Sequence, residues 1–156
     1  MFSINTQAEL DLLNDQIFRQ FEKTGLVISA MPGGYGLPPV AFTIGGAATG
    51  HPDLIMYGIA PGLAVPSLEN AFSVVKERWP FPNFEFSDQV LAGYDVRFRD
   101  VSRSDLLHRT MVLTRAFNLQ KKFSQTPLLQ VLWPDENGVF PHESGCDAGV
   151  AACQRI

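Results

Sequence analysis

Three short apolar segments between residues 26 and 59 constrain the fold of this chain more than any other feature of its sequence. Residues 26–31 and 39–44 are strand-like, and the turn chemistry of Pro32-Gly33-Gly34-Tyr35-Gly36 lies between them. Residues 54–59 are typical of a buried strand, closed by Pro61-Gly62. We therefore expect a β-hairpin followed by a third strand.

Two helical patterns flank these strands. Thr6-Gln7-Ala8-Glu9 has the form of a capping box, and apolar residues then recur at helical spacing until Gly25. A second apolar stripe runs through residues 68–79 and ends at Pro80, which cannot continue a helix. Each pattern predicts an amphipathic helix.

The second half of the chain predicts two more strands and one more helix. Residues 79–84 form a proline-punctuated loop with three aromatic residues, which we expect to pack on the surface. Residues 94–99 alternate strictly between apolar and polar, the pattern of a strand with one buried face. Ser102 or Ser104 can cap a helix that runs to about residue 123, and residues 128–133 form the last strand.

This order of elements predicts an α+β fold. We expect a single domain, residues 1–145, with a mainly antiparallel sheet of about five strands and three helices packed on it. The remaining residues, 146–156, are expected to be an irregular tail. Strands and helices do not alternate as in a doubly wound fold, and no dinucleotide fingerprint follows any strand.

Composition excludes several functional classes. The chain is 46% hydrophobic and 18% charged, which rules out wholesale disorder. The net charge of −4 has the wrong sign for nucleic-acid binding, and no basic cluster reverses this. The N-terminus lacks a secretory layout and no apolar run reaches membrane-spanning length, so we expect a cytoplasmic protein without membrane contact. Cys146 and Cys153 are expected to be free thiols, although a disulfide in an oxidising compartment stays open.

The loop from Thr43 to Asp53 is the strongest candidate for a binding site. It is rich in glycine but lacks the lysine and the Ser/Thr of a phosphate-binding P-loop. It carries the polar cluster His51-Pro52-Asp53 at the rim of an apolar sheet, where binding groups concentrate. We predict that Thr43, His51 and Asp53 line a concavity whose walls include Tyr57 and Trp133.

A metal site is the alternative. His51, Asp53, His142 and Glu143 would suit zinc or iron(II) if they converged, with a carboxylate left to activate water. No nucleophile motif is present, and neither cysteine has basic surroundings that lower a thiol pKa. No residue is assigned a catalytic role, and outside this alternative no cofactor is expected.

Several motifs together resemble a bacterial domain of unknown function, family 4262, over about residues 25–143. They are Ala41-Phe42-Thr43-Ile44-Gly45, residues 51–59 from His51-Pro52-Asp53, Val96-Arg97-Phe98, and residues 129–135 ending in Trp133-Pro134-Asp135, followed by Gly138 and Phe140-Pro141. The chain has Gly46, Asp53 and His142 where that family usually has Leu, Glu and Trp. The resemblance implies a small bacterial or phage-borne cytosolic domain, brings no established activity, and weakens a metal role for His142.

Two functions follow from these observations. The first is a non-catalytic binding domain for an unidentified protein partner or small ligand, for example in immunity or counter-defence. The second is a small metal-assisted hydrolase built on the four residues named above. Whether the chain is an enzyme, and whether it forms a homo-oligomer, is left open by the sequence.

Overall fold

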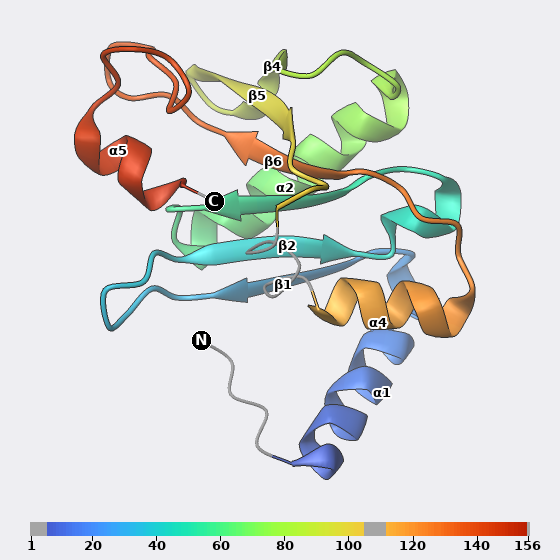
Figure 1. The fold of residues 1–156 in the computed structure, drawn as a ribbon. Coiled ribbons are helices and arrows are strands. Elements are labelled where there is room, and N and C mark those ends of the chain that lie inside the picture. Colours follow the sequence, from blue (N-terminus) through green and yellow to red (C-terminus); the bar gives the residue numbers. More distant parts are fainter. Residues whose placement is uncertain (1–5, 105–111, 156) are drawn as a thin grey trace.

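The computed structural model describes residues 6–104 and 112–155. Within these ranges six strands form one sheet in the order β1-β2-β3-β6-β5-β4, and four α-helices accompany it (Figure 1). The strands are β1 (Val27–Met31), β2 (Val40–Ile44), β3 (Asp53–Tyr57), β4 (Glu85–Leu91), β5 (Tyr94–Asp100) and β6 (Leu128–Leu132). The helices are α1 (Gln7–Thr24), α2 (Pro61–Arg78), α4 (Val112–Lys121) and α5 (Ala148–Cys153), with a 3₁₀ turn, η1 (Gly46–Thr49), before β3.

The α+β class and the mainly antiparallel sheet are confirmed. Among the described strands only β3 and β6 run parallel, and every other neighbouring pair is antiparallel. The hairpin of β1 and β2 and the third strand beside it are present as predicted. None of the helices in the described ranges is long and apolar enough to cross a membrane.

The capping box at the start of α1 forms as predicted. Thr6 Oγ1 accepts a hydrogen bond from the Glu9 backbone N–H at 3.2 Å, and Glu9 Oε2 accepts one from the Thr6 N–H at 3.1 Å. These two bonds satisfy backbone donors that the first turn of a helix leaves unpaired. Gly25, at φ 77°, ends the helix in a left-handed conformation that glycine adopts without steric cost.

The sheet has a core on each face. Helix α2 covers one face, whereas α1 and α4 cover part of the other (Figure 1). Because side chains alternate along a strand, Leu54 and Met56 of β3 face α2 while Ile55 and Tyr57 face the opposite side. The second core contains Ile17, Val27, Phe42, Ile44, Ile55, Tyr57, Val101, Phe117 and Leu128.

Strand β4 was not predicted from the sequence. Its pairing with β5 shifts register between Ser87 and Leu91, so its side chains do not alternate regularly between the two faces. Ser87 and Val90 are both buried, with two exposed residues between them. This irregularity removes the period-2 pattern by which a strand is recognised in a sequence. The loop before it is packed as expected, because the Phe81 ring lies 5.2 Å from the ring of Phe98.

The C-terminal tail is more ordered than predicted. Residues 148–153 form α5 instead of irregular coil, and the Asp147 side chain caps it by accepting a 3.0 Å hydrogen bond from the Val150 N–H. The predicted helix from Ser102 or Ser104 to residue 123 is confirmed over Val112–Lys121. Its expected first part, residues 105–111, lies outside the described residues.

Candidate functional site

Thr43 and Asp53 lie together, as predicted, but in the interior. Thr43 Oγ1 donates a 2.7 Å hydrogen bond to Asp53 Oδ1 and accepts one of 2.9 Å from the Leu54 N–H. The same carboxylate oxygen accepts a 3.0 Å bond from the Gly46 N–H. Both side chains are fully buried, so this polar junction ties the β2–β3 connection together and does not line an open concavity.

The Asp53 carboxyl is a buried acid whose pKa is strongly raised. Burial raises its pKa to about 6, because desolvation disfavours the charged form more than the hydrogen bonds from Thr43 and Gly46 favour it. The Asn118 side chain of α4 also favours the charged form, yet Asp53 Oδ2 has no hydrogen-bond partner. One oxygen of the carboxyl is therefore the natural position for a proton near pH 6.

His51 is held within its turn. Its backbone N–H donates to the Gly46 carbonyl at 3.1 Å, and its ring Nδ1 lies 2.8 Å from Thr49 Oγ1. The imidazole packs edge-on against Phe72 of α2, with the ring centroids 6.2 Å apart. These contacts give His51 a structural role in the loop. A ligand contact at this histidine remains a prediction.

Tyr57 and Trp133 do not join the Thr43, His51 and Asp53 group. Tyr57 is the last residue of β3 and Asp53 the first, a separation of four residues or about 13 Å along the strand. Trp133 follows β6 at the same end as Tyr57, and its indole Nε1 donates a 2.7 Å bond to the Tyr57 carbonyl. The structure therefore does not bring these five residues into the single concavity that was predicted. The length of β3 holds the two groups of residues at opposite ends of the strand.

The alternative metal site does not assemble either. Among the described residues, no three His, Cys, Asp or Glu side chains are placed to hold one ion. His51 precedes β3, whereas the His142 ring stacks 4.2 Å from the ring of Phe84, which precedes β4. Two strands separate β3 from β4, which amounts to about 14 Å at the usual strand spacing.

The acid of the Trp133-Pro134-Asp135 motif is also structural. Asp135 Oδ1 accepts hydrogen bonds from the N–H groups of Asn137 at 2.9 Å and Val139 at 3.0 Å. Its Oδ2 accepts one from the Asp147 N–H at 2.9 Å. These bonds lower the Asp135 pKa, the bond from Asp147 contributing most. The Asp135 side chain therefore stabilises the segment that leads to α5.

Both cysteines are free thiols, as expected. Desolvation raises the pKa of Cys146 and of Cys153, and nearby carboxylates raise that of Cys146 further. A raised pKa lowers the fraction of reactive thiolate at neutral pH. The pair thus does not have the electrostatic setting of a catalytic nucleophile.

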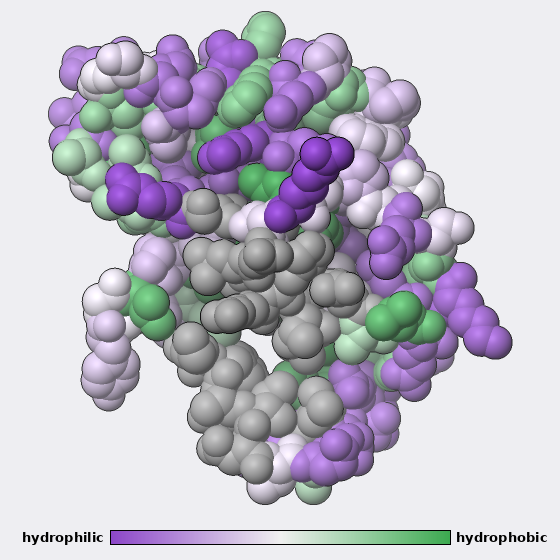
Figure 2. Space-filling model, in the orientation of Figure 1, coloured by the Kyte–Doolittle hydropathy of each residue, from purple (hydrophilic) through white to green (hydrophobic). Residues whose placement is uncertain are grey.

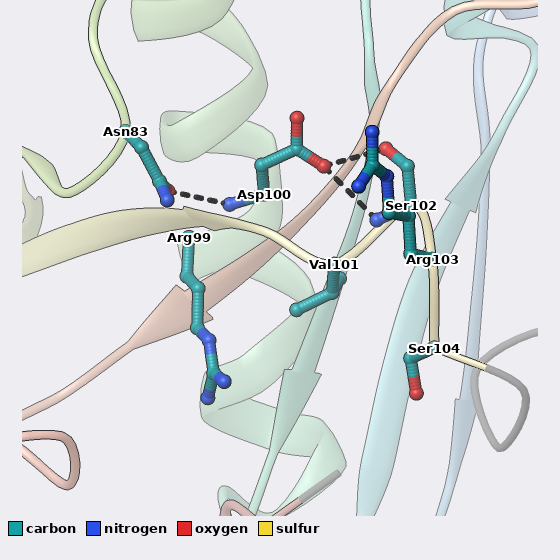
Figure 3. Close-up of a pocket in the computed structure, with 7 residues that line it drawn as sticks. All are labelled: Asn83, Arg99, Asp100, Val101, Ser102, Arg103 and Ser104. Atoms are coloured by element: carbon teal, nitrogen blue, oxygen red, sulfur yellow. Dashed lines mark hydrogen bonds between the residues drawn. The ribbon is translucent and has the colours of Figure 1, made fainter.

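A cleft of about 470 Å³ lies at the end of β5. Figure 3 shows its lining: Asn83, Arg99, Asp100, Val101, Ser102, Arg103 and Ser104. Its floor is fixed by hydrogen bonds, because Asn83 Oδ1 accepts from the Asp100 N–H at 2.8 Å and Asp100 Oδ1 accepts from the Ser102 hydroxyl at 2.6 Å. The volume is within the usual range for small-ligand sites.

Arg99 is a cation of this cleft that has no compensating carboxylate among the described residues. Its side chain is half-buried, and within the described residues it makes no hydrogen bond and has no carboxylate within 4.0 Å. Arg97 lies two residues earlier on the same face of β5, about 7 Å along the strand. Desolvation lowers the pKa of His142, Glu143 opposes this shift, and the two arginines add to it.

Arg97 itself is held in place by aromatic rings. Its guanidinium carbon lies 5.3 Å from the Phe140 ring centroid and 5.9 Å from that of Phe86, and its Nη1 donates a 2.9 Å bond to the Phe84 carbonyl. Sequence reasoning assigned Arg97 and Arg99 to the wet face of a strand and gave them no role. The sequence did contain a signal for a role: two cations stand two residues apart, on one face of the strand predicted at residues 94–99.

Fold and site together define an α+β protein with a cationic cleft beside a cluster of arginine and aromatic side chains. The family model that matches the chain covers residues 20–147 and is described as a domain of unknown function, DUF4262. Because the match spans most of the chain, the protein belongs to the DUF4262 family, as the motifs of the sequence indicated. Comparison with curated proteins and with solved structures gave no significant match.

Proposed function

We propose that this domain is a non-catalytic binding module that recognises an anionic group, a carboxylate or a phosphate, in the cleft at the end of β5. The observation that carries this proposal is Arg99, a half-buried guanidinium without a counter-charge in the described residues. Partial removal of an arginine from water is unfavourable unless an anion or hydrogen-bond acceptors replace that water. A bound anion supplies both.

The surroundings of Arg99 support this proposal. Arg103 adds a second cation to the cleft, and Asp100 adds one negative charge, so the lining has an excess of one positive charge. Arginine presents a planar fork of donors that matches carboxylate and phosphate oxygens. Within a chain of net charge −4, a cationic cleft also attracts anions to one defined place.

A metal-assisted hydrolase is the weaker alternative, because each of its four residues has other contacts. Asp53 is buried against Thr43 and Gly46, and His142 stacks on Phe84. In this proposal the anionic group lies on a partner protein that acts in bacterial conflict or regulation. A small anionic metabolite satisfies the same chemistry.

Thermal shift measurements with two anions test the proposal. Inorganic phosphate and citrate are added at equal ionic strength, with sodium chloride as the reference. We expect one of them to raise the Tm of the native protein, because a ligand that binds only the folded state stabilises it. The Arg99→Gln variant should lose this shift, whereas the control Arg19→Gln, which removes an exposed cation of α1, should keep it.

Two outcomes would count against the cleft. One is an equal shift in Arg99→Gln and the native protein, which would place anion binding elsewhere. The other is no shift with either anion beyond that of sodium chloride. A larger shift with citrate than with phosphate would identify carboxylate recognition, and the reverse order would identify phosphate recognition.

A further inference from the structure

The two edges of the sheet are protected to very different degrees. Among the described strands, the order β1-β2-β3-β6-β5-β4 leaves β1 and β4 with a neighbouring strand on one side only. Strand β4 carries Glu85 and Asp88, forms an ion pair between Glu85 and Arg78 at 3.3 Å, and shifts register partway along its length. Charges and bulges are the devices by which proteins prevent unwanted pairing at a sheet edge.

Strand β1 has none of these devices. Its sequence, Val27-Ile28-Ser29-Ala30-Met31, contains no charged residue and no proline, and it pairs with β2 over all five residues without a register shift. From Thr24 to Pro52 the chain has no Asp, Glu, Lys or Arg. In the described structure, no backbone group of β1 forms a hydrogen bond to a backbone group outside the sheet.

The hairpin that follows β1 exposes apolar side chains beyond the end of this strand. The tip is a two-residue turn closed by reciprocal 3.0 Å hydrogen bonds between the backbones of Gly34 and Leu37. Tyr35 occupies this turn at φ 52° and is fully exposed, and Leu37 is 48% exposed. Figure 2 shows the hairpin projecting from the body of the molecule, without the deep purple of charged residues.

The conformation of Tyr35 is unfavourable for this chain alone. A bulky residue with a left-handed backbone is strained, and turns of this kind favour Asn, Asp or Gly. Full exposure means that the phenol ring gains no packing that would offset the strain. Strain of this kind that persists without an internal gain is a reason to look for a contact outside the chain.

We propose that β1 pairs antiparallel with β1 of a second copy of this chain, joining two six-stranded sheets across a two-fold axis at Ser29. In this register Val27 faces Met31 of the second copy and Ile28 faces its Ala30. Two identical antiparallel strands are complementary about their central residue, so a symmetric dimer satisfies both edges at once. The proposal does not depend on the anion cleft, which lies at the other side of the sheet.

Charge favours a second copy as the occupant of this edge. Two chains of net charge −4 repel each other over most of their surfaces. The stretch from Thr24 to Pro52 is the longest part of the chain without Asp, Glu, Lys or Arg, so two copies can meet there without like charges in contact. Extension of the same register past the strands places each hairpin tip beside the last turn of α1 of the other copy, which gives Tyr35 a surface to pack on.

Sedimentation velocity over about 5–200 µM protein, near the affinity range of weak protein contacts, tests this proposal. We expect the native chain to shift from its monomer mass of 17.2 kDa to twice that mass as concentration rises. Ser29→Lys, which places like charges at the two-fold axis, should weaken dimerisation at least tenfold. Gln89→Lys makes the same change of charge on the protected edge strand β4 and should leave the dimer unchanged.

Tyr35→Asn is a second variant that does not depend on Ser29→Lys folding. Asparagine suits the left-handed turn, so this variant should have an unchanged or higher Tm and yet dimerise more weakly. Hydrogen exchange provides an independent measurement, because the β1 amides should become protected as protein concentration rises.

Three results would overturn the proposal. The first is a native chain that stays monomeric over the whole range, even if β1 becomes protected by a different protein. The second is a folded Ser29→Lys variant that dimerises as the native chain does. The third applies if Ser29→Lys does not fold by circular dichroism, and is a Tyr35→Asn variant with undiminished dimerisation.

Discussion

Thr43 Oγ1 donates a 2.7 Å hydrogen bond to Oδ1 of Asp53, ten residues further along the chain, and both side chains are fully buried. The hydroxyl also accepts from the Leu54 N–H, so one threonine joins β2, the start of β3 and a buried acid. Thr114 of α4 extends the group, since its Oγ1 donates a 3.0 Å bond to the Thr43 carbonyl. This junction fixes the loop in which the sequence predicted a binding site.

Asp53→Asn should change how stability depends on pH. The folded pKa of about 6 lies above the ordinary aspartate pKa of 3.8, so between these values the folded state binds more protons than the unfolded state. The free energy of unfolding of the native chain should therefore fall as pH rises through this window, by up to about 3 kcal/mol, and then stay level. Asparagine keeps an acceptor for Thr43 and Gly46 and should remove this contribution.

Urea denaturation at intervals from pH 4 to pH 8 measures this effect. Asp95→Asn, which neutralises an exposed carboxylate on β5, is the matched control and should retain the native slope. A slope in Asp53→Asn equal to that of the native chain would show that Asp53 is not the titrating group.

Thr43→Val should destabilise the fold with little change in side-chain volume. The substitution removes the donor to Asp53 and the acceptor for the Leu54 N–H, and leaves both groups buried without those partners. Each group left without its partner costs about 1–3 kcal/mol, so the two together predict a loss of roughly 2–6 kcal/mol in chemical denaturation. Thr24→Val, at an exposed threonine near the end of α1, should cost much less, and equal losses would contradict the special role of Thr43.

Asp135→Ala should destabilise the segment that leads to α5. Three backbone N–H groups lose their common acceptor, so we expect a lower free energy of unfolding at neutral pH. Because the folded pKa of Asp135 is lowered, its contribution to stability is fully present above the ordinary aspartate pKa of 3.8 and is lost as pH falls through the lower folded pKa. Denaturation of the variant and of the neighbouring control Glu136→Gln, measured at pH 7 and in acid, checks both statements.

Gln154→Ala should release α5 without unfolding the sheet. The Gln154 side chain accepts a 3.0 Å bond from the Trp133 N–H and donates one of 2.9 Å to the Trp133 carbonyl, as a neighbouring strand would. Its own carbonyl accepts from Gln130 Nε2 at 2.7 Å. We expect faster hydrogen exchange in residues 148–153 and little change in β2 or β3. The exposed Arg155→Ala serves as the control, and unchanged exchange in Gln154→Ala would show that the helix is held by other contacts.

Much of the architecture could be predicted because its signals are local. The capping box of Thr6 and Glu9, the helical stripe of α2 and the strict alternation of β5 each depend on residues a few positions apart. The apolar side chains of the α2 stripe from Leu68 to Val75, and Val96 and Phe98 of β5, are buried as these patterns predict, whereas Tyr94 is 50% exposed. Strand β4 escaped prediction because its irregular pairing between Ser87 and Leu91 destroys the local period.

The candidate site shows where sequence reasoning ended. The sequence placed Thr43, His51, Asp53, Tyr57 and Trp133 in one site because they are polar or aromatic residues near strand ends. The length and direction of the strands decide which end each residue occupies, and Asp53 and Tyr57 lie at opposite ends of β3. The sequence likewise left Arg99 as one cation on a wet strand face.

Local chemistry by itself determined the α+β class, the helix ends and the β-hairpin, because capping, periodicity and turn propensity act between residues close in the chain. Only the tertiary structure decided the environment of individual polar groups, because burial and the distance between charges depend on segments remote in sequence. Burial in the assembled fold raises the pKa of Asp53 to about 6. Asn118, whose side chain also affects this pKa, is 65 positions away in the sequence. Arg99 lacks a counter-charge because the strands beside it bring none within 4.0 Å in the described structure.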